Sequence, residues 1–203
     1  MDKANPLSTP MVVRSLNVEK DPFRPCEDNE EIVGPEVPYL SAIGALMYLA
    51  NCTRPDIAFA VNLLARFSSS LTRRHWNGIK HIFRYLQGTI DLGLFYPNES
   101  KKGLIGYADA GHLSDPHKAR SQTGYVFTCG GTAISWRSQK QTLVATSSNH
   151  AEVIALHENN VLFSLTMVLY HWVLLVKFLT RHILVWWMTK GECYEKLSSI
   201  LSL

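Results

Sequence analysis

The chain has 203 residues, 46% of them hydrophobic and 18% charged, which excludes a wholly disordered protein and predicts one domain of moderate size or two small ones. Its formal net charge of +3 is unevenly spread, because residues 1–36 carry eight acids against four Lys and Arg, whereas residues 37–203 carry sixteen Lys and Arg against nine acids. A basic body of this kind is compatible with a polyanionic partner but does not require one.

Four cysteines are scattered along the chain, at Cys26, Cys52, Cys129 and Cys193, without C-x-x-C spacing. This pattern argues against a zinc site and against a dense disulfide framework. It predicts a reducing, intracellular compartment, either the cytoplasm or the nucleus. The N-terminal stretch MDKANPLSTPMVV contains no apolar run of signal-peptide length, which agrees with that expectation.

Residues 1–37 form an acidic segment that is rich in Pro, Asp and Glu, with EKDPFRPCEDNEE at its centre. The segment shows neither helical nor alternating periodicity. It is predicted to be an irregular linker or an extended strap.

Three stretches with helical periodicity follow, at residues 39–52, 54–70 and 73–88. Pro55 suits the first turn of the second helix, and Gly88 is expected to end the third in a left-handed cap. The residues expected to face inward are Leu40, Ile43, Leu46, Met47 and Ala50 in the first helix, Ile57, Val61, Leu64 and Phe67 in the second, and Trp76, Ile79, Phe83 and Leu86 in the third.

The outer face of the third helical stretch carries Arg73, Arg74, Lys80, His81 and Arg84 and no acid. A solvated helix face is the simplest interpretation. The alternative is a surface that follows a phosphate backbone, with Arg73, Arg74, Lys80 and Arg84 as nucleic-acid-binding residues.

After Gly88 the pattern changes to a period of two, and four strands are expected at residues 92–97, 102–110, 122–131 and 132–138. The sequence CGGT between the last two predicts a tight hairpin turn. A helix is then expected to begin with Asn149 as its N-cap and Glu152 three residues later. Helices, then strands, then a helix predict an α+β fold.

Residues 161–189 are apolar on all sides and carry only Lys177 and Arg181 as fixed charges. The uncharged run from 161 to 176 is slightly shorter than the roughly 18 to 20 residues that cross a bilayer. The sequence leaves three alternatives open: a membrane helix, a buried helix, or a segment that was never selected to fold. The charges and two histidines in the segment weigh against membrane insertion.

Asp109, in the stretch YADAGHLSD, is the first candidate for chemistry, because a carboxylate at the end of a central strand can hold a divalent cation in an accessible groove. The alternative is a strand-end residue that turns the chain. Glu152 could serve the helix cap alone, or it could converge with Asp109 if its helix packs across the sheet. Asp115 is expected in a turn. The histidines His112, His117 and His150 are not at metal-ligand spacing and are expected on the surface.

Four stretches in order carry a family resemblance: YLSAIGALMYLANCTRPDIAFAVNLLARFSS, HWNGIKHIFRYLQGTIDLGLFY, GYADAGHLSDPHKARSQTGYVF and GGTAISWRSQKQTLVATSSNHAEVIAL. They resemble the Pol polyprotein of copia-type LTR retrotransposons of plants, over residues 5–158. The similarity covers the end of the reverse transcriptase module and the first part of the RNase H domain.

The resemblance implies four regions. Residues 1–37 are the acidic linker or strap, and residues 38–90 are a helical region like the reverse transcriptase thumb and connection. Residues 91–158 are a partial RNase H-like domain, with a mixed sheet and a helix. Residues 159–203 are an apolar tail that resembles nothing in the family, with one or more helices.

The resemblance also implies that Asp109 and Glu152 are catalytic residues and the first two ligands of a two-magnesium site that hydrolyses RNA in RNA:DNA hybrids. The family's third and fourth acids belong to a strand ending in DN and to a later segment of the type TKHI, and neither follows the helix in this sequence. We therefore expect Mg²⁺ to bind weakly and the nuclease to be defective.

The expected function is that of a retrotransposon polyprotein fragment descended from a ribonuclease H, with an RNA:DNA hybrid or another nucleic acid as partner. One alternative is a nucleic-acid-binding remnant that does not cut. Another is a product anchored in a membrane through residues 161–189.

Overall fold

The structure, a computed structural model, describes residues 4–15, 17–28, 30–34, 36–96 and 103–159. The contacts divide the chain into two compact units, residues 1–159 and residues 160–203. The alternatives predicted for residues 161–189 lie outside the described residues. Among the residues that are described, no helix is both long enough and apolar enough to cross a membrane.

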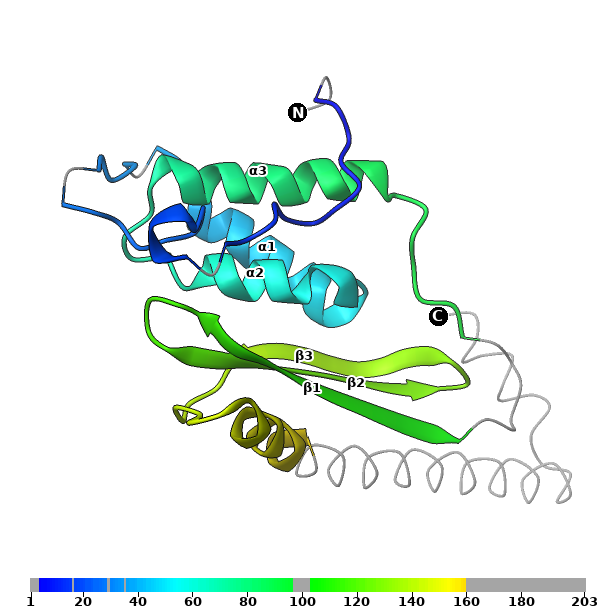
Figure 1. Ribbon diagram of the computed structural model, residues 1–203. Coiled ribbons are helices and arrows are strands. Elements are labelled where there is room, and N and C mark those ends of the chain that lie inside the picture. The colour runs from blue at the N-terminus through cyan, green and yellow to red at the C-terminus, as the bar shows by residue number, and fades with distance from the viewer. Residues whose placement is uncertain (1–3, 16, 29, 35, 97–102, 160–203) are drawn as a thin grey trace, which may run out of the picture. The chain divides into compact units, whose positions relative to one another are not determined.

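The first unit has an α+β fold, as the sequence predicts (Figure 1). Its three main helices are α1 (Tyr39–Cys52), α2 (Ala58–Ala65) and α3 (Arg73–Gly88), and short 3₁₀ turns lie at Val18–Lys20 and Pro55–Ile57. The strands are β1 (Leu104–Asp115), β2 (Arg120–Cys129) and β3 (Thr132–Lys140). A further helix runs over residues 148–159.

The three strands form a sheet in the order β1-β2-β3, and both pairs are antiparallel. The resemblance implied a mixed sheet, but the described sheet is antiparallel throughout, so that expectation is wrong for the described strands. The strand expected at 92–97 is wrong for its described part, residues 92–96, which form no strand. This segment instead lies beside the start of β3, where the Tyr96 hydroxyl donates to the Ala133 carbonyl oxygen over 2.9 Å.

The hairpin between β2 and β3 is confirmed. Cys129 pairs with Thr132, and Gly130 and Gly131 between them have positive φ angles of 63° and 83°. A two-residue hairpin turn whose twist matches that of its strands requires positive φ angles at both central residues. Glycine adopts positive φ angles without steric cost.

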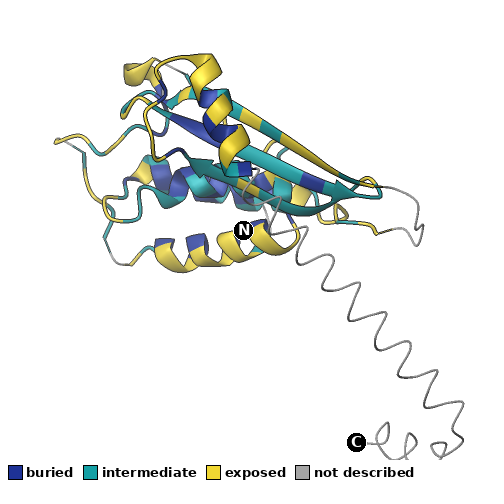
Figure 2. Cartoon of the chain, turned by 90° about the horizontal axis from the view of Figure 1, so that it is seen from below, coloured by how far each residue is buried: buried dark blue, intermediate teal, exposed yellow. Residues whose placement is uncertain are grey.

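The helices enclose an apolar core, with dark blue buried residues on their inner sides and yellow exposed residues outside (Figure 2). Two predicted core residues of α1 are wrong, because Leu40 is 68% exposed and Met47 is 44% exposed. The buried face of α1 is instead rotated slightly, toward Tyr39 and Ala42. Tyr39 is buried among α2 and α3, and its hydroxyl donates to the Leu64 carbonyl oxygen over 2.8 Å.

In the second and third predicted stretches, 54–70 and 73–88, most of the residues expected to face inward do pack on the core, although α2 itself covers only Ala58–Ala65. Ile57, Val61, Leu64 and Ile79 are at most 1% exposed, and the remaining predicted residues of these two stretches, Phe67, Trp76, Phe83 and Leu86, are partly buried against them. The sequence pattern missed His75, Gly78, Ile82 and Tyr85, which are also buried on α3.

The end of α3 differs from the expectation for Gly88. Gly88 is the last helical residue, and the cap is Thr89, whose φ of −133° is not left-handed. A Cβ on Gly88 would lie 3.0 Å from both the Leu7 carbonyl oxygen and the Pro6 side chain. The glycine therefore allows the N-terminal segment to approach the helix closely, rather than a left-handed turn.

The acidic N-terminal segment, which we call the strap (residues 4–37), runs along the surface of the helices (Figure 1). The Leu7 amide donates to the Arg84 carbonyl oxygen, and the Val33 amide donates to that of Leu71. Phe23 inserts into the helical core and is 3% exposed. The strap is thus part of the packed unit and contributes one of its core residues.

Candidate functional site

Asp109 lies in the middle of β1, not at the end of a strand, and its side chain is exposed. In the described sheet β1 is an outer strand, because β2 is the strand between the other two. Asp109 is paired with Gly124 of β2, and Gly124 with Ser138 of β3. A cavity of about 300 Å³ borders this row, and its lining includes Asp109, Phe59 and Trp136.

The register decides which face of the sheet Asp109 occupies. Directly opposed residues share a face, and neighbours along a strand alternate. Trp136 lies two residues from Ser138, and its indole N–H donates to the Ala50 carbonyl oxygen of α1 over 2.6 Å. Asp109 therefore faces the layer of α1 and α2.

Glu152 belongs to the helix at residues 148–159, which packs on the other face. Gln141 joins this helix to the sheet, because its side-chain amide donates to Thr123 Oγ1 over 3.0 Å and to the Ala151 carbonyl oxygen over 2.9 Å. Thr123 is paired with Ala110, which packs against the buried Ala151 and Ile154. Asp109 and Glu152 are therefore on opposite faces, and the structure does not bring the two carboxylates together.

The expected cap of this helix is wrong. The helix begins at residue 148, and the Ser147 hydroxyl accepts a hydrogen bond from the His150 amide over 3.1 Å. Ser147 is thus the N-cap, and Asn149 is already helical. His150 stands at the third helical position and accepts a hydrogen bond from the Thr146 amide over 3.3 Å. Glu152 has no role in this cap.

The described ranges contain no group of three or more His, Cys, Asp or Glu side chains that could hold a metal ion. The two predicted ligands do not fit a shared Mg²⁺ in this arrangement, since a sheet separates them. Whether either residue binds magnesium stays a prediction.

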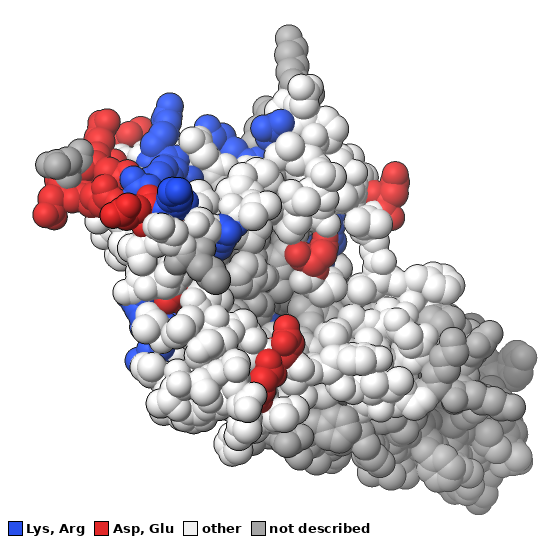
Figure 3. All heavy atoms as spheres, viewed as in Figure 1, with Lys and Arg blue, Asp and Glu red and all other residues white. Residues whose placement is uncertain are grey.

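The predicted nucleic-acid-binding residues on α3 divide into two kinds. Arg74 forms an ion pair with Glu30 of the strap, and Arg84 Nε donates to the Asn5 carbonyl oxygen over 2.7 Å. Arg73 and Lys80 make no hydrogen bond or ion pair with the rest of the described chain. Figure 3 shows basic and acidic side chains interleaved where α3 begins. The bare basic face expected from α3 alone is therefore partly neutralised by the strap.

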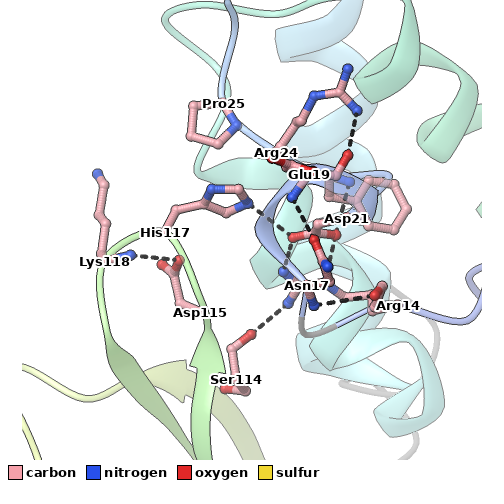
Figure 4. A network of polar contacts seen from close by, with 12 residues as sticks. Arg14, Asn17, Glu19, Asp21, Arg24, Pro25, Ser114, Asp115, His117 and Lys118 are labelled. Atoms are coloured by element: carbon pink, nitrogen blue, oxygen red, sulfur yellow. Dashed lines mark hydrogen bonds and ion pairs between the residues drawn. The ribbon is translucent and has the colours of Figure 1, made fainter.

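The strap also meets the sheet, in a polar network that the sequence did not reveal (Figure 4). Asp21 is fully buried and paired with Arg14, whose Nη1 donates to the Ser114 carbonyl oxygen over 2.8 Å. Burial alone would raise the pKa of Asp21, but hydrogen bonds from Arg14 and from the Phe23 amide outweigh it and hold the pKa below its usual value. His117 lies 3.2 Å from the same carboxylate, so the expectation of a surface histidine is wrong here.

A second ion pair adjoins this network. Asp115 does lie at a turn, as expected, and accepts a hydrogen bond from the Lys118 amide over 3.3 Å. It is also buried, 3.4 Å from Arg66 Nη1 and 3.9 Å from Lys140 Nζ. Asp21 and Asp115 each stand beside a proline in the sequence. Arg14 is only seven positions from Asp21, but His117 is 96 positions from Asp21 and Arg66 is 49 from Asp115.

Comparison with known proteins identifies relatives at high identity. The chain is 47% identical over 122 residues to the Secreted RxLR effector protein 161 of Plasmopara viticola, which covers 60% of this chain and 86% of that protein. It is 43% identical over 160 residues, 78% of its length, to the retrovirus-related Pol polyprotein from transposon TNT 1-94 of Nicotiana tabacum. A similar polyprotein from transposon RE2 of Arabidopsis thaliana is 41% identical over 114 residues. The chain is thus similar to retrovirus-related Pol polyproteins of plant transposons.

The chain spans only 12% of the tobacco polyprotein and 8% of the RE2 polyprotein. No family model matches it, and no solved structure matches it. The comparisons therefore show a similarity to one part of Pol polyproteins and do not say which of their activities that part supports.

Proposed function

We propose that this chain is a Pol segment from the junction between the reverse transcriptase helices and the RNase H domain, and that it does not itself cleave RNA. The order of the quoted sequence motifs supports the location. The single observation that carries the loss of cleavage is the placement of Asp109 and Glu152 on opposite faces of the sheet.

The physical reason lies in the charge of a two-metal site. Two divalent cations about 4 Å apart carry four positive charges, and carboxylates must converge from one side to anchor and bridge them. Asp109 projects toward α1 and α2, whereas Glu152 belongs to a helix behind the sheet. Neither residue supplies the second ligand that the other would need.

The test is a cleavage assay with the full chain, a labelled RNA:DNA hybrid and Mg²⁺. We expect cleavage at background level, and no difference between the wild type and Asp109→Asn or Glu152→Gln. Asp91→Asn, at an exposed position before the sheet, is the matched control. Strong cleavage that both site variants abolish and the control retains would refute the proposal.

The same hybrid serves to test the alternative of binding without cleavage through α3. Because Arg74 and Arg84 are engaged by the strap, only Arg73 and Lys80 are expected to contribute. Binding should therefore be weak, and its affinity should fall only slightly with salt. A steep salt dependence that Lys80→Ala and Arg84→Ala reduce would favour a nucleic-acid-binding remnant over the proposal.

A further inference from the structure

A small cavity lies where the strap, the end of α2 and the turn after β1 meet. Its volume is about 160 Å³, the room of roughly five water molecules at about 30 Å³ each. Positively charged side chains and hydroxyl groups dominate its polar lining, which includes Arg14, Arg66, Lys118, Lys140, Ser69 and Ser70.

The charges around the cavity do not balance. Arg14, Arg66, Lys118 and Lys140 bring four positive charges, and among the described residues the acids paired with them are Asp21 and Asp115. Each acid is already shared, because Arg14 and His117 both contact Asp21, and both Arg66 and Lys140 approach one oxygen of Asp115. The excess of two positive charges equals the charge of one phosphate dianion.

The side chain of Arg66 adds a second indication. Its two terminal nitrogens bond to Asn62, Gln122 and Asp115, but its buried Nε has no hydrogen-bond partner among the described atoms. A buried donor without a partner is unfavourable, so an acceptor in reach of it would be favoured.

The titration behaviour agrees with an excess of cations. Burial lowers the pKa of Lys140, and the neighbouring charge of Arg66 lowers it further, despite the opposing effect of Asp115. Burial likewise lowers the pKa of Arg66, and Arg14 adds to that effect. An anion in the cavity would relieve this repulsion.

We propose that this cavity binds a phosphate group, held by Arg66 and Lys140 with the exposed Lys118 at its rim. Guanidinium and ammonium groups are the usual partners of phosphate oxygens, and the Ser69 and Ser70 hydroxyls can donate as well. Two sources share this chemistry, a free phosphate ion and the backbone phosphate of a nucleic acid. The proposal does not depend on whether the chain cleaves RNA.

The test titrates the full chain with inorganic phosphate against chloride at equal ionic strength, by calorimetry and by thermal unfolding. We expect saturable phosphate binding and a rise in the unfolding temperature that chloride does not produce. Lys140→Gln should weaken phosphate binding about tenfold, as the loss of one charge-assisted hydrogen bond does. Lys80→Gln, on α3 and outside this cavity, is the matched control and should bind as the wild type does.

Because Lys140 also contacts Asp115, Lys118→Gln provides a second variant at an exposed position that leaves the fold intact. It should weaken binding less than Lys140→Gln but measurably. Equal effects of phosphate and chloride, or unchanged phosphate affinity in both variants, would overturn the proposal.

A competition arm separates the two sources. A short RNA:DNA hybrid is added to the phosphate-loaded chain. Displacement of phosphate by the hybrid identifies a backbone phosphate as the natural occupant, whereas phosphate that stays bound identifies a free phosphate ion.

Discussion

In the helical layer, α1, α2 and α3 meet through apolar side chains, whereas the sheet meets its neighbours mainly through polar ones. Fourteen buried apolar residues form the described helical core, but the cluster between the sheet and the helix at 148–159 has three. The sheet is held instead by single contacts such as Trp136 to Ala50, Gln122 to Asn62 and Gln141 to Ala151.

This difference affects how each region responds to change. Apolar burial is non-directional and spread over many residues, so the helical layer tolerates small shifts of its elements. A hydrogen bond or ion pair requires one particular partner, so the position of the sheet depends on a few named side chains. Substitutions in the two regions should therefore differ in size and in kind.

The largest effect is expected from Leu46→Ala, because Leu46 is 0% exposed at the centre of the helical core. Loss of its buried side chain should lower the free energy of unfolding by about 2–5 kcal/mol. Leu40→Ala is the matched control on the same helix, since Leu40 is 68% exposed, and it should change stability by less than about 0.5 kcal/mol. Urea denaturation measures both, and similar losses for the two variants would contradict the assigned core.

The ion pairs of the sheet predict the next effect. Asp115→Asn leaves Arg66 and Lys140 facing each other without their shared carboxylate. The free energy of unfolding should fall by about 1–3 kcal/mol. Asp91→Asn, at an exposed position, should have almost no effect. If the two Asn variants are equally stable, the ion pairs of Asp115 contribute nothing to stability, and the sheet does not depend on its polar contacts as proposed.

Two glycines in helices sharpen the comparison further. A Cβ on Gly78 would lie 2.9 Å from the side chains of both Leu64 and Phe23, so Gly78→Ala should lower stability by about 1–3 kcal/mol. Gly44 in α1 has no atom within 4 Å of that position, and Gly44→Ala should raise stability by about 0.5–1 kcal/mol. Thermal unfolding of both variants provides the measurement, and a stable Gly78→Ala protein would show that the strap does not pack as described.

The smallest effect is a dependence of stability on pH from His75. Burial lowers its pKa, and its Nδ1 accepts a hydrogen bond from the Thr72 amide over 3.0 Å, which fixes the neutral ring. Below the usual value of about 6.5 the unfolded chain binds a proton that the folded chain does not, so stability is present above that pH and is lost as the pH falls.

The loss due to this one group is at most about 1.4 kcal/mol per pH unit. His75→Phe keeps the stacking on Phe67 but cannot titrate, so its stability should fall less than that of the wild type between pH 7 and pH 5. Denaturation at the two pH values checks this, and parallel losses in both proteins would rule out His75 as the source.

The sequence predicted where the helices lie better than it predicted which side of each helix faces the core. A period of three to four residues shows that a stretch is helical, but the direction of the core depends on where the other helices lie. The burial of Tyr39 in place of Leu40 is of this kind, because Tyr39 reaches the Leu64 carbonyl oxygen on another helix. Likewise Ser147, Ser148 and Asn149 are all suitable caps, and only the fold selected Ser147.

The candidate site was harder to predict for the same reason. The residue types of Asp109 and Glu152 suggested a metal site, but a shift of one position along a strand moves a side chain to the other face. The register of β1 against β2 put Asp109 beside α1 and α2. No local pattern in the sequence contains that information.

By itself, the sequence determined the helical stretches, the glycine hairpin, the acidic strap and the likeness to Pol polyproteins, because each depends on residues that are close together in the sequence. The tertiary structure alone decided the faces of the two carboxylates and the partners of the buried charges. Arg66 and Asp115 are 49 positions apart, and Arg74 and Glu30 are 44 apart. Such pairs form only when packing brings distant segments together, so their chemistry follows from the fold.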